Sequence, residues 1–148
     1  MNHSHPPLEI DPNELTPGNV LISLNAGQDE PTQIQTHQFV INANNRSDDK
    51  KGQASPIELV LSGLGLSLAQ ILDLAIKKEA IHVDNIHVAL SYQNNTSDKN
   101  KPTTAITREV IIDGHIETKE RELIQKAIAL CPMQKILQGN FTIDTILI

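Results

Sequence analysis

Aromatic residues are scarce in this chain of 148 residues, which contains two Phe, one Tyr and no Trp. Aromatic side chains provide the surfaces on which nucleobases and sugars stack, so this composition argues against ligands of either kind. The formal net charge of -6 also argues against nucleic-acid binding, which requires a basic surface that faces the phosphates. The hydrophobic core must therefore be built from Leu, Ile and Val side chains.

The sequence contains one cysteine, Cys131, which excludes an intramolecular disulfide and a CxxC redox pair. Six histidines are present, but they form neither an HExxH motif nor a cluster with the cysteine. The sequence also has no glycine-rich phosphate-binding loop. We therefore predict neither a metal ion nor an organic cofactor.

Long uncharged segments are missing as well. The longest is Leu59–Leu72, 14 residues, whereas a helix that spans a bilayer needs about 20. Residues 1–15 contain no basic segment followed by an apolar one, so we expect no secretory signal there. These absences predict a soluble cytoplasmic protein with no membrane partner.

The hydrophobic pattern predicts one domain, residues 18–148, preceded by a flexible, proline-rich arm over residues 1–17. Alternation of apolar residues predicts five strands, over residues 20–24, 33–41, 83–92, 105–112 and 141–147. Helical spacing predicts helices over residues 56–79, 118–130 and 133–137, the last of them short. The order β-β-α-β-β-α-β is typical of an α+β fold with helices on one largely antiparallel sheet.

The long helix is expected to lie buried at the centre of the fold. Ser55 is a favourable N-cap, and Pro56 suits the first helical position because its missing N–H would have no partner there. Apolar residues occupy most of the helix circumference, yet one sheet covers only one side. We therefore predict a homodimer in which two long helices pack through small residues that include Gly63 and Gly65. Alternatively, the second helix covers that side alone.

Two residues carry possible nucleophiles. Cys131 precedes Pro132, so it is expected at the N-cap of the short helix, where amide dipoles stabilise a thiolate. The alternative is a buried, inert cysteine. Ser67 lies in a segment that superficially resembles a nucleophile elbow, but such an elbow needs a strand before the serine, and Ser67 lies within the predicted helix. A hydrolytic role for Ser67 is therefore disfavoured.

Four segments of the sequence form a combined pattern: Ser55–Leu61, the apolar run to Leu74, the strand from Ile86 and the segment Ala129–Leu137, which contains Cys-Pro. Together they resemble the OsmC/Ohr family, which comprises osmotically inducible protein C and the organic hydroperoxide resistance proteins. The resemblance extends over residues 18–148. It implies the OsmC-like fold and an intertwined homodimer with the active site at the interface.

The resemblance also implies a set of functional positions. Peroxidases of the family use an attacking cysteine in the central helix and a resolving cysteine in the Cys-Pro motif, with an Arg and a Glu that activate the first thiolate. In this chain the attacking position is Ser67, and the Glu position is Ile57. Residues 1–45 contain no Lys or Arg that could supply the Arg, and only the resolving Cys131 is retained. A serine hydroxyl cannot replace the attacking thiol, because it is not ionised at neutral pH and forms no sulfenate.

Two functions are compatible with these residues. The first is a stress-associated OsmC-like protein that lacks two-cysteine hydroperoxide reductase activity and binds a small hydrophobic ligand in an interface pocket formed by Ile57, Gly63, Ser67 and Cys131. The alternative is a one-cysteine thiol peroxidase or redox sensor. In that case Cys131 reacts with organic hydroperoxides and an external thiol recycles it.

Overall fold

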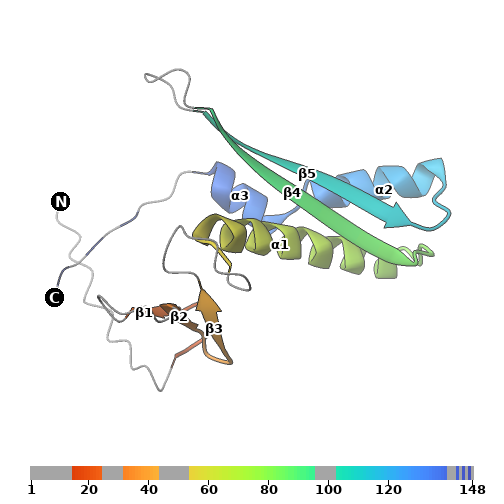
Figure 1. The fold of residues 1–148 in the computed structure, drawn as a ribbon. Helices are drawn as coiled ribbons and strands as arrows, with labels where there is room; N and C mark the ends of the chain where they lie inside the picture. The colour runs from red at the N-terminus through yellow and green to blue at the C-terminus, as the bar shows by residue number, and fades with distance from the viewer. Residues whose placement is uncertain are drawn as a thin grey trace, which may run out of the picture. The chain divides into compact units, whose positions relative to one another are not determined.

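The computed structural model describes residues 15–24, 32–43, 54–95 and 103–139, together with residues 143, 145 and 147. The chain forms two compact units: one comprises Met1–Leu59 and Ile143–Ile148, and the other comprises Val60–Thr142. The combination of antiparallel strands and helices confirms the predicted α+β class (Figure 1).

The first unit contains a three-stranded antiparallel sheet, in the order β1-β2-β3. Its strands are β1 (Leu21–Ser23), β2 (Thr32–Gln35) and β3 (Val40–Ala43). Ile34 of β2 pairs with Ile22 of β1 on one side and with Ile41 of β3 on the other. All three residues lie within the two N-terminal strands that the sequence predicts, over residues 20–24 and 33–41.

The prediction of one strand over residues 33–41 is wrong, because a turn at Thr36–Phe39 divides it. The Thr36 N–H donates to the Phe39 carbonyl at 2.9 Å. The Thr36 hydroxyl oxygen accepts the N–H groups of Gln38 and Phe39, at 3.3 and 3.2 Å. A threonine side chain that satisfies nearby backbone groups offers an alternative to the strand ladder. The segment therefore reverses direction and forms β2 and β3.

Helix α1 (Pro56–Lys78) begins where the sequence predicts. The Ser55 N–H donates to the Glu58 carboxylate at 2.6 Å, and the Glu58 N–H donates to the Ser55 hydroxyl at 3.3 Å. This reciprocal pair is a capping box, which satisfies two backbone donors at the helix start. The hydrogen bonds from the backbone and side chain of Ser55 hold the pKa of Glu58 below its ordinary value.

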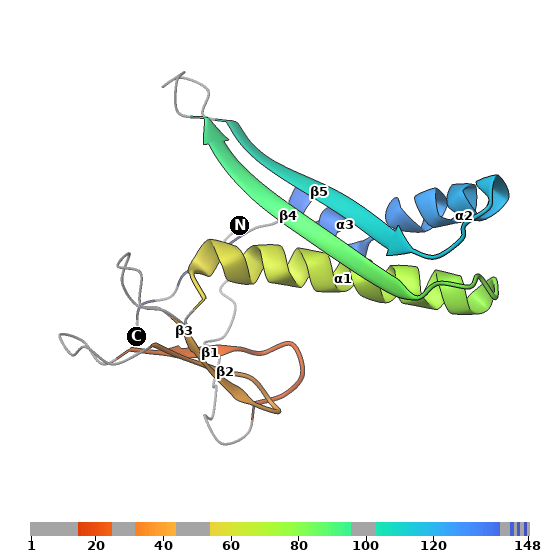
Figure 2. The same cartoon turned by 45° about the vertical axis from the view of Figure 1, so that its right-hand side comes forward.

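The second unit packs a long hairpin and two helices against α1 (Figures 1 and 2). The hairpin consists of β4 (Asn85–Asn95) and β5 (Thr103–Asp113), which pair antiparallel. The helices are α2 (Thr118–Ile128) and α3 (Pro132–Gln138). Helix α2 begins at the predicted residue, Thr118, and Glu117 before it is the N-cap, whose N–H donates to the Glu120 carboxylate at 2.9 Å.

The core of this unit is aliphatic, as the shortage of aromatic residues requires. Its buried members are Leu64, Leu68, Leu72, Ile76, Ile81, Ile124, Ala127 and Cys131. The strand residues that pack against it, such as Val88 and Val110, alternate along β4 and β5. The face of the hairpin that meets α1 is therefore apolar over most of its length.

The described residues cover only one side of α1. Leu68 and Leu72 are fully buried, whereas Leu66 and Leu74 are 61% and 63% exposed. By length and composition α1 could cross a membrane, but the core helix of a soluble protein has the same properties. The helix that was predicted to lie buried at the centre of the fold is thus buried on one face by the described residues.

The expected five-stranded sheet is also corrected. The described strands form two sheets, β1-β2-β3 and β4-β5. The strand expected over residues 141–147 lies largely outside the described residues. The strong alternation of residues 85–113 predicts the second sheet well, but periodicity cannot show which strands pair.

Candidate functional site

The structure places Ser67 beside Cys131, although they are 64 positions apart in the sequence. Ser67 lies midway along α1, and Cys131 lies directly before α3. The Cys131 thiol donates to the Ser67 hydroxyl oxygen at 3.7 Å, and the Met133 N–H approaches the same oxygen at 3.5 Å. Cys131 is fully buried. The hydroxyl thus takes part in fixing the start of α3 against α1.

The backbone around Cys131 holds the thiol in place. Cys131 is the N-cap of α3, and Pro132 follows it at the helix start, as the sequence predicts. The Cys131 N–H donates to the Ile128 carbonyl at 3.3 Å, and the Lys135 N–H donates to the Cys131 carbonyl at 3.3 Å. Cys131 is therefore anchored both to the preceding helix segment and to α3.

Sequence reasoning missed Arg108. This arginine lies on β5 opposite Leu90 of β4, and it is partly buried. Its guanidinium donates to the Gln134 side-chain oxygen of α3. Nη1 of Arg108 is buried and has no hydrogen-bond partner among the described residues. The signal for this residue was its position, because Arg108 interrupts a series of apolar residues on one face of a strand.

The environment of Cys131 favours the thiolate. Burial by itself raises the pKa of the thiol. Hydrogen bonds from the Gln134 backbone N–H and the Ser67 hydroxyl lower it, as do the hydrogen bond and positive charge of Arg108. The lowering effects outweigh burial, so the pKa of Cys131 lies below its ordinary value. The reactive form of the side chain is therefore stabilised inside a buried site.

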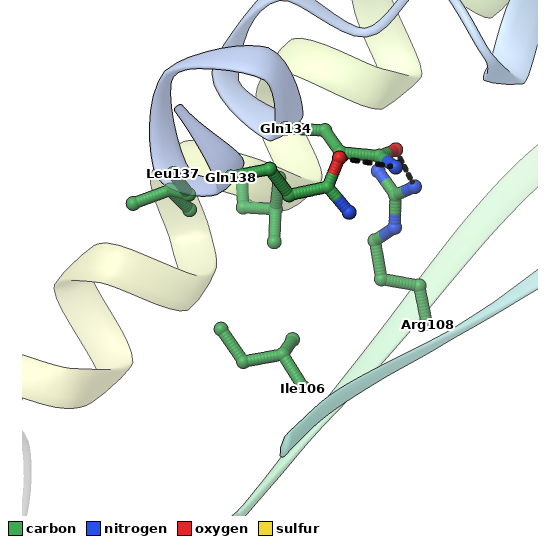
Figure 3. Close-up of a pocket in the computed structure, with 6 residues that line it drawn as sticks. Ile106, Arg108, Gln134, Leu137 and Gln138 are labelled. Carbon is green, nitrogen blue, oxygen red and sulfur yellow. Dashed lines mark hydrogen bonds between the residues drawn. The ribbon is translucent and has the colours of Figure 1, made fainter. Parts of the chain in front are cut away.

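A pocket of about 450 Å³ lies between β5, α1 and α3 (Figure 3). Its lining residues are Leu64, Ile106, Arg108, Gln134, Leu137 and Gln138. Its polar side is ordered by a chain of hydrogen bonds: Arg108 donates to Gln134, and the Gln134 amide nitrogen donates to the Gln138 oxygen at 3.3 Å. Figure 3 shows Ile106 apart from this polar group, so the pocket has an apolar side as well.

The residues predicted to form a pocket do not line this one. Ser67 and Cys131 contact each other directly, and neither is among the lining residues. Cys131 precedes the lining residue Gln134 by three positions in the sequence. Gly63 is half-buried, and a Cβ atom built there would meet no heavy atom within 4 Å. Ile57 lies in the first turn of α1 and is 36% exposed. Within the described part of the chain, no group of three or more metal-ligating side chains is found.

Comparisons with known proteins agree on one family. The family model described as OsmC-like protein matches residues 47–146. No curated protein matches. Among solved structures, the OsmC-like protein from Mycoplasma pneumoniae has 20% sequence identity and a TM-score of 0.64, with coverage of 82% of this chain and 86% of that chain.

Two further solved structures have the same fold. The organic hydroperoxide resistance protein OhrB of Bacillus subtilis has 20% identity and a TM-score of 0.55, covering 82% of this chain and 92% of its own. The organic hydroperoxide resistance protein OsmC from Legionella pneumophila has 13% identity and a TM-score of 0.59, covering 84% and 93%. The predicted resemblance is confirmed, and the chain belongs to the OsmC family.

Proposed function

We propose that this protein is a stress-related member of the OsmC family that does not reduce hydroperoxides by the two-cysteine route and instead binds a small hydrophobic ligand. The observation that carries the proposal is the contact between Ser67 and Cys131. The residue that meets the single cysteine from the central helix carries a hydroxyl group where the family resemblance implies a thiol.

The chemistry explains why one missing sulfur matters. In the two-cysteine route, a thiolate attacks the peroxide O–O bond, becomes a sulfenic acid and releases an alcohol. The second thiol then displaces water and forms a disulfide. This chain has one sulfur nucleophile, Cys131, so the second step has no intramolecular partner. Ser67 can accept or donate a hydrogen bond but cannot be oxidised in this way.

A homodimer belongs to this proposal. The exposed side of α1 carries Leu66 and Leu74, two large apolar residues that are more than half exposed in the single chain. Burial of such residues against a second copy is favourable, at about 25 cal/mol per Å² of apolar surface. We further propose a cytoplasmic protein in which residues 18–148 act as one OsmC-like domain behind the arm over residues 1–17.

A second candidate function has specific support. The lowered pKa of Cys131 and the nearby charge of Arg108 favour a one-cysteine thiol peroxidase or redox sensor. In that reaction the Cys131 thiolate attacks an organic hydroperoxide, the alcohol leaves, and an external thiol reduces the sulfenic acid. The complete burial of Cys131 opposes this function, because the peroxide must reach the sulfur atom.

Intact-mass measurement after exposure to cumene hydroperoxide separates the two functions. We expect the native protein to keep its mass and its free thiol, as determined by subsequent alkylation under denaturing conditions. The Cys131→Ser variant is the matched control for oxidation elsewhere. Addition of oxygen to the native protein that is absent from this control would support the one-cysteine peroxidase and refute our first proposal.

A further inference from the structure

Arg108 carries a positive charge beside the Cys131 thiol, whose pKa it lowers, but the described residues place no carboxylate against it. It shares a strand face with apolar residues that pack on the core, and its Nη1 atom is buried without a hydrogen-bond partner. No carboxylate forms an ion pair with Arg108 within the parts of the chain that the structure describes. A buried charged donor without a partner is unfavourable, so this position favours an anion from outside the described chain.

The hydrogen bonds around Arg108 fix which atoms face that anion. An arginine side chain can only donate, so Gln134 must present its oxygen to Arg108. The Gln134 amide nitrogen is then directed to the oxygen of Gln138. Gln138 is left with its own amide nitrogen, which makes no further hydrogen bond among the described residues and lies on the same side as the guanidinium in Figure 3. The polar side of the pocket therefore offers two groups of donors.

The rest of the pocket is apolar. Leu64, Ile106 and Leu137 complete its lining. A volume of about 450 Å³ lies within the range of about 300–1,000 Å³ that is common for small-molecule sites. A ligand that fits must combine an acceptor group with a hydrocarbon portion.

We propose that this pocket binds an aliphatic monocarboxylate. Its carboxylate accepts hydrogen bonds from Arg108 Nη1 and from the Gln138 amide, and its hydrocarbon chain contacts Leu64, Ile106 and Leu137. A carboxylate is an acceptor-only group with two oxygens, which matches a pair of donor groups and neutralises the guanidinium. This inference rests on the proposed ligand-binding function and names the chemical class of the ligand.

Titration of the full-length protein with octanoate tests the proposal. We expect saturable binding by calorimetry and a shift of the Gln138 side-chain amide signals in NMR spectra. Octanol, which has the same chain length but no charge, should bind at least tenfold more weakly. That ratio corresponds to about 1.4 kcal/mol for the charged group.

Three variants locate the binding site. Arg108→Gln removes the charge and should weaken octanoate binding at least tenfold, with a much smaller effect on octanol binding. Gln138→Glu, at an exposed position, replaces a donor by a negative charge and should have a similar effect even if Arg108→Gln fails to fold. Lys135→Gln removes an exposed positive charge from the same helix, outside the pocket lining, and should leave octanoate binding unchanged.

Equal binding of octanoate and octanol would overturn the carboxylate proposal but support the hydrophobic-ligand function. Loss of octanoate binding in Lys135→Gln to the same extent as in Gln138→Glu would overturn it too, because general attraction of the anion would then suffice. If neither compound binds, both the inference and the proposed ligand-binding function fail.

Discussion

Replacement of Ser67 by cysteine should convert the hydrogen bond with Cys131 into a disulfide bond. The two side-chain atoms lie 3.7 Å apart in the native chain. A disulfide requires a separation of about 2.05 Å, which side-chain rotation and a small backbone movement must supply. We therefore expect Ser67→Cys to form an intramolecular disulfide under mild oxidation, without large rearrangement of α1 or α3.

The size of the effect follows from the chain separation. The new bond would close a loop of 64 residues. A loop of this length lowers the conformational entropy of the unfolded chain, which raises the free energy of unfolding by about 4 kcal/mol in the chain-entropy treatment of disulfides. For a domain of this size, that difference corresponds to an increase in melting temperature on the order of 10 °C for the oxidised over the reduced variant.

Thiol titration under denaturing conditions and thermal unfolding with and without reductant measure these outcomes. Ser62→Cys is the matched control, since it introduces a thiol at an exposed position on the same helix and should leave both thiols free. If Ser67→Cys keeps two free thiols after oxidation of the folded protein, Ser67 does not occupy the position from which an attacking cysteine could meet Cys131.

Two other predictions concern the core and the thiol. Leu72→Ala should lower the free energy of unfolding by about 2–5 kcal/mol, because it leaves a cavity at a fully buried position. Ile111→Ala, at a position that is 52% exposed, should lower it far less. Urea denaturation measures both free energies. The rate of Cys131 alkylation should reach half its maximum at a lower pH than the rate for a free cysteine does. Arg108→Gln should move this midpoint to higher pH, because it removes a hydrogen bond and a positive charge that favour the thiolate. An unchanged midpoint in the variant would show that Arg108 does not act on the thiol.

The elements with strong local signals were predictable from the sequence. Ser55 and Pro56 mark the start of α1, and the structure adds the reciprocal hydrogen bonds of a capping box. The alternation of residues in β4 and β5 is regular enough to reveal the hairpin. The turn at Thr36 was not predictable in the same way, because the competition between its hydroxyl group and the strand ladder depends on geometry rather than on hydrophobic period.

The candidate site was only partly predictable. The family resemblance singled out Ser67 and Cys131, and the structure brings their side chains together. Arg108 could not be found by the same means, because the resemblance implies an Arg within residues 1–45, which contain none, whereas Arg108 lies on β5. Its interruption of an apolar strand face was visible in the sequence. The hydrogen bond that joins it to Gln134 depends on packing between β5 and α3.

The most direct test of the central claim is the initial rate at which the reduced native protein consumes cumene hydroperoxide in the presence of dithiothreitol. We predict a rate equal to that of the Cys131→Ser variant, because a serine stands where the reaction needs its attacking sulfur. A rate for the native protein well above that of Cys131→Ser would contradict this claim and assign peroxidase activity to the single buried thiol.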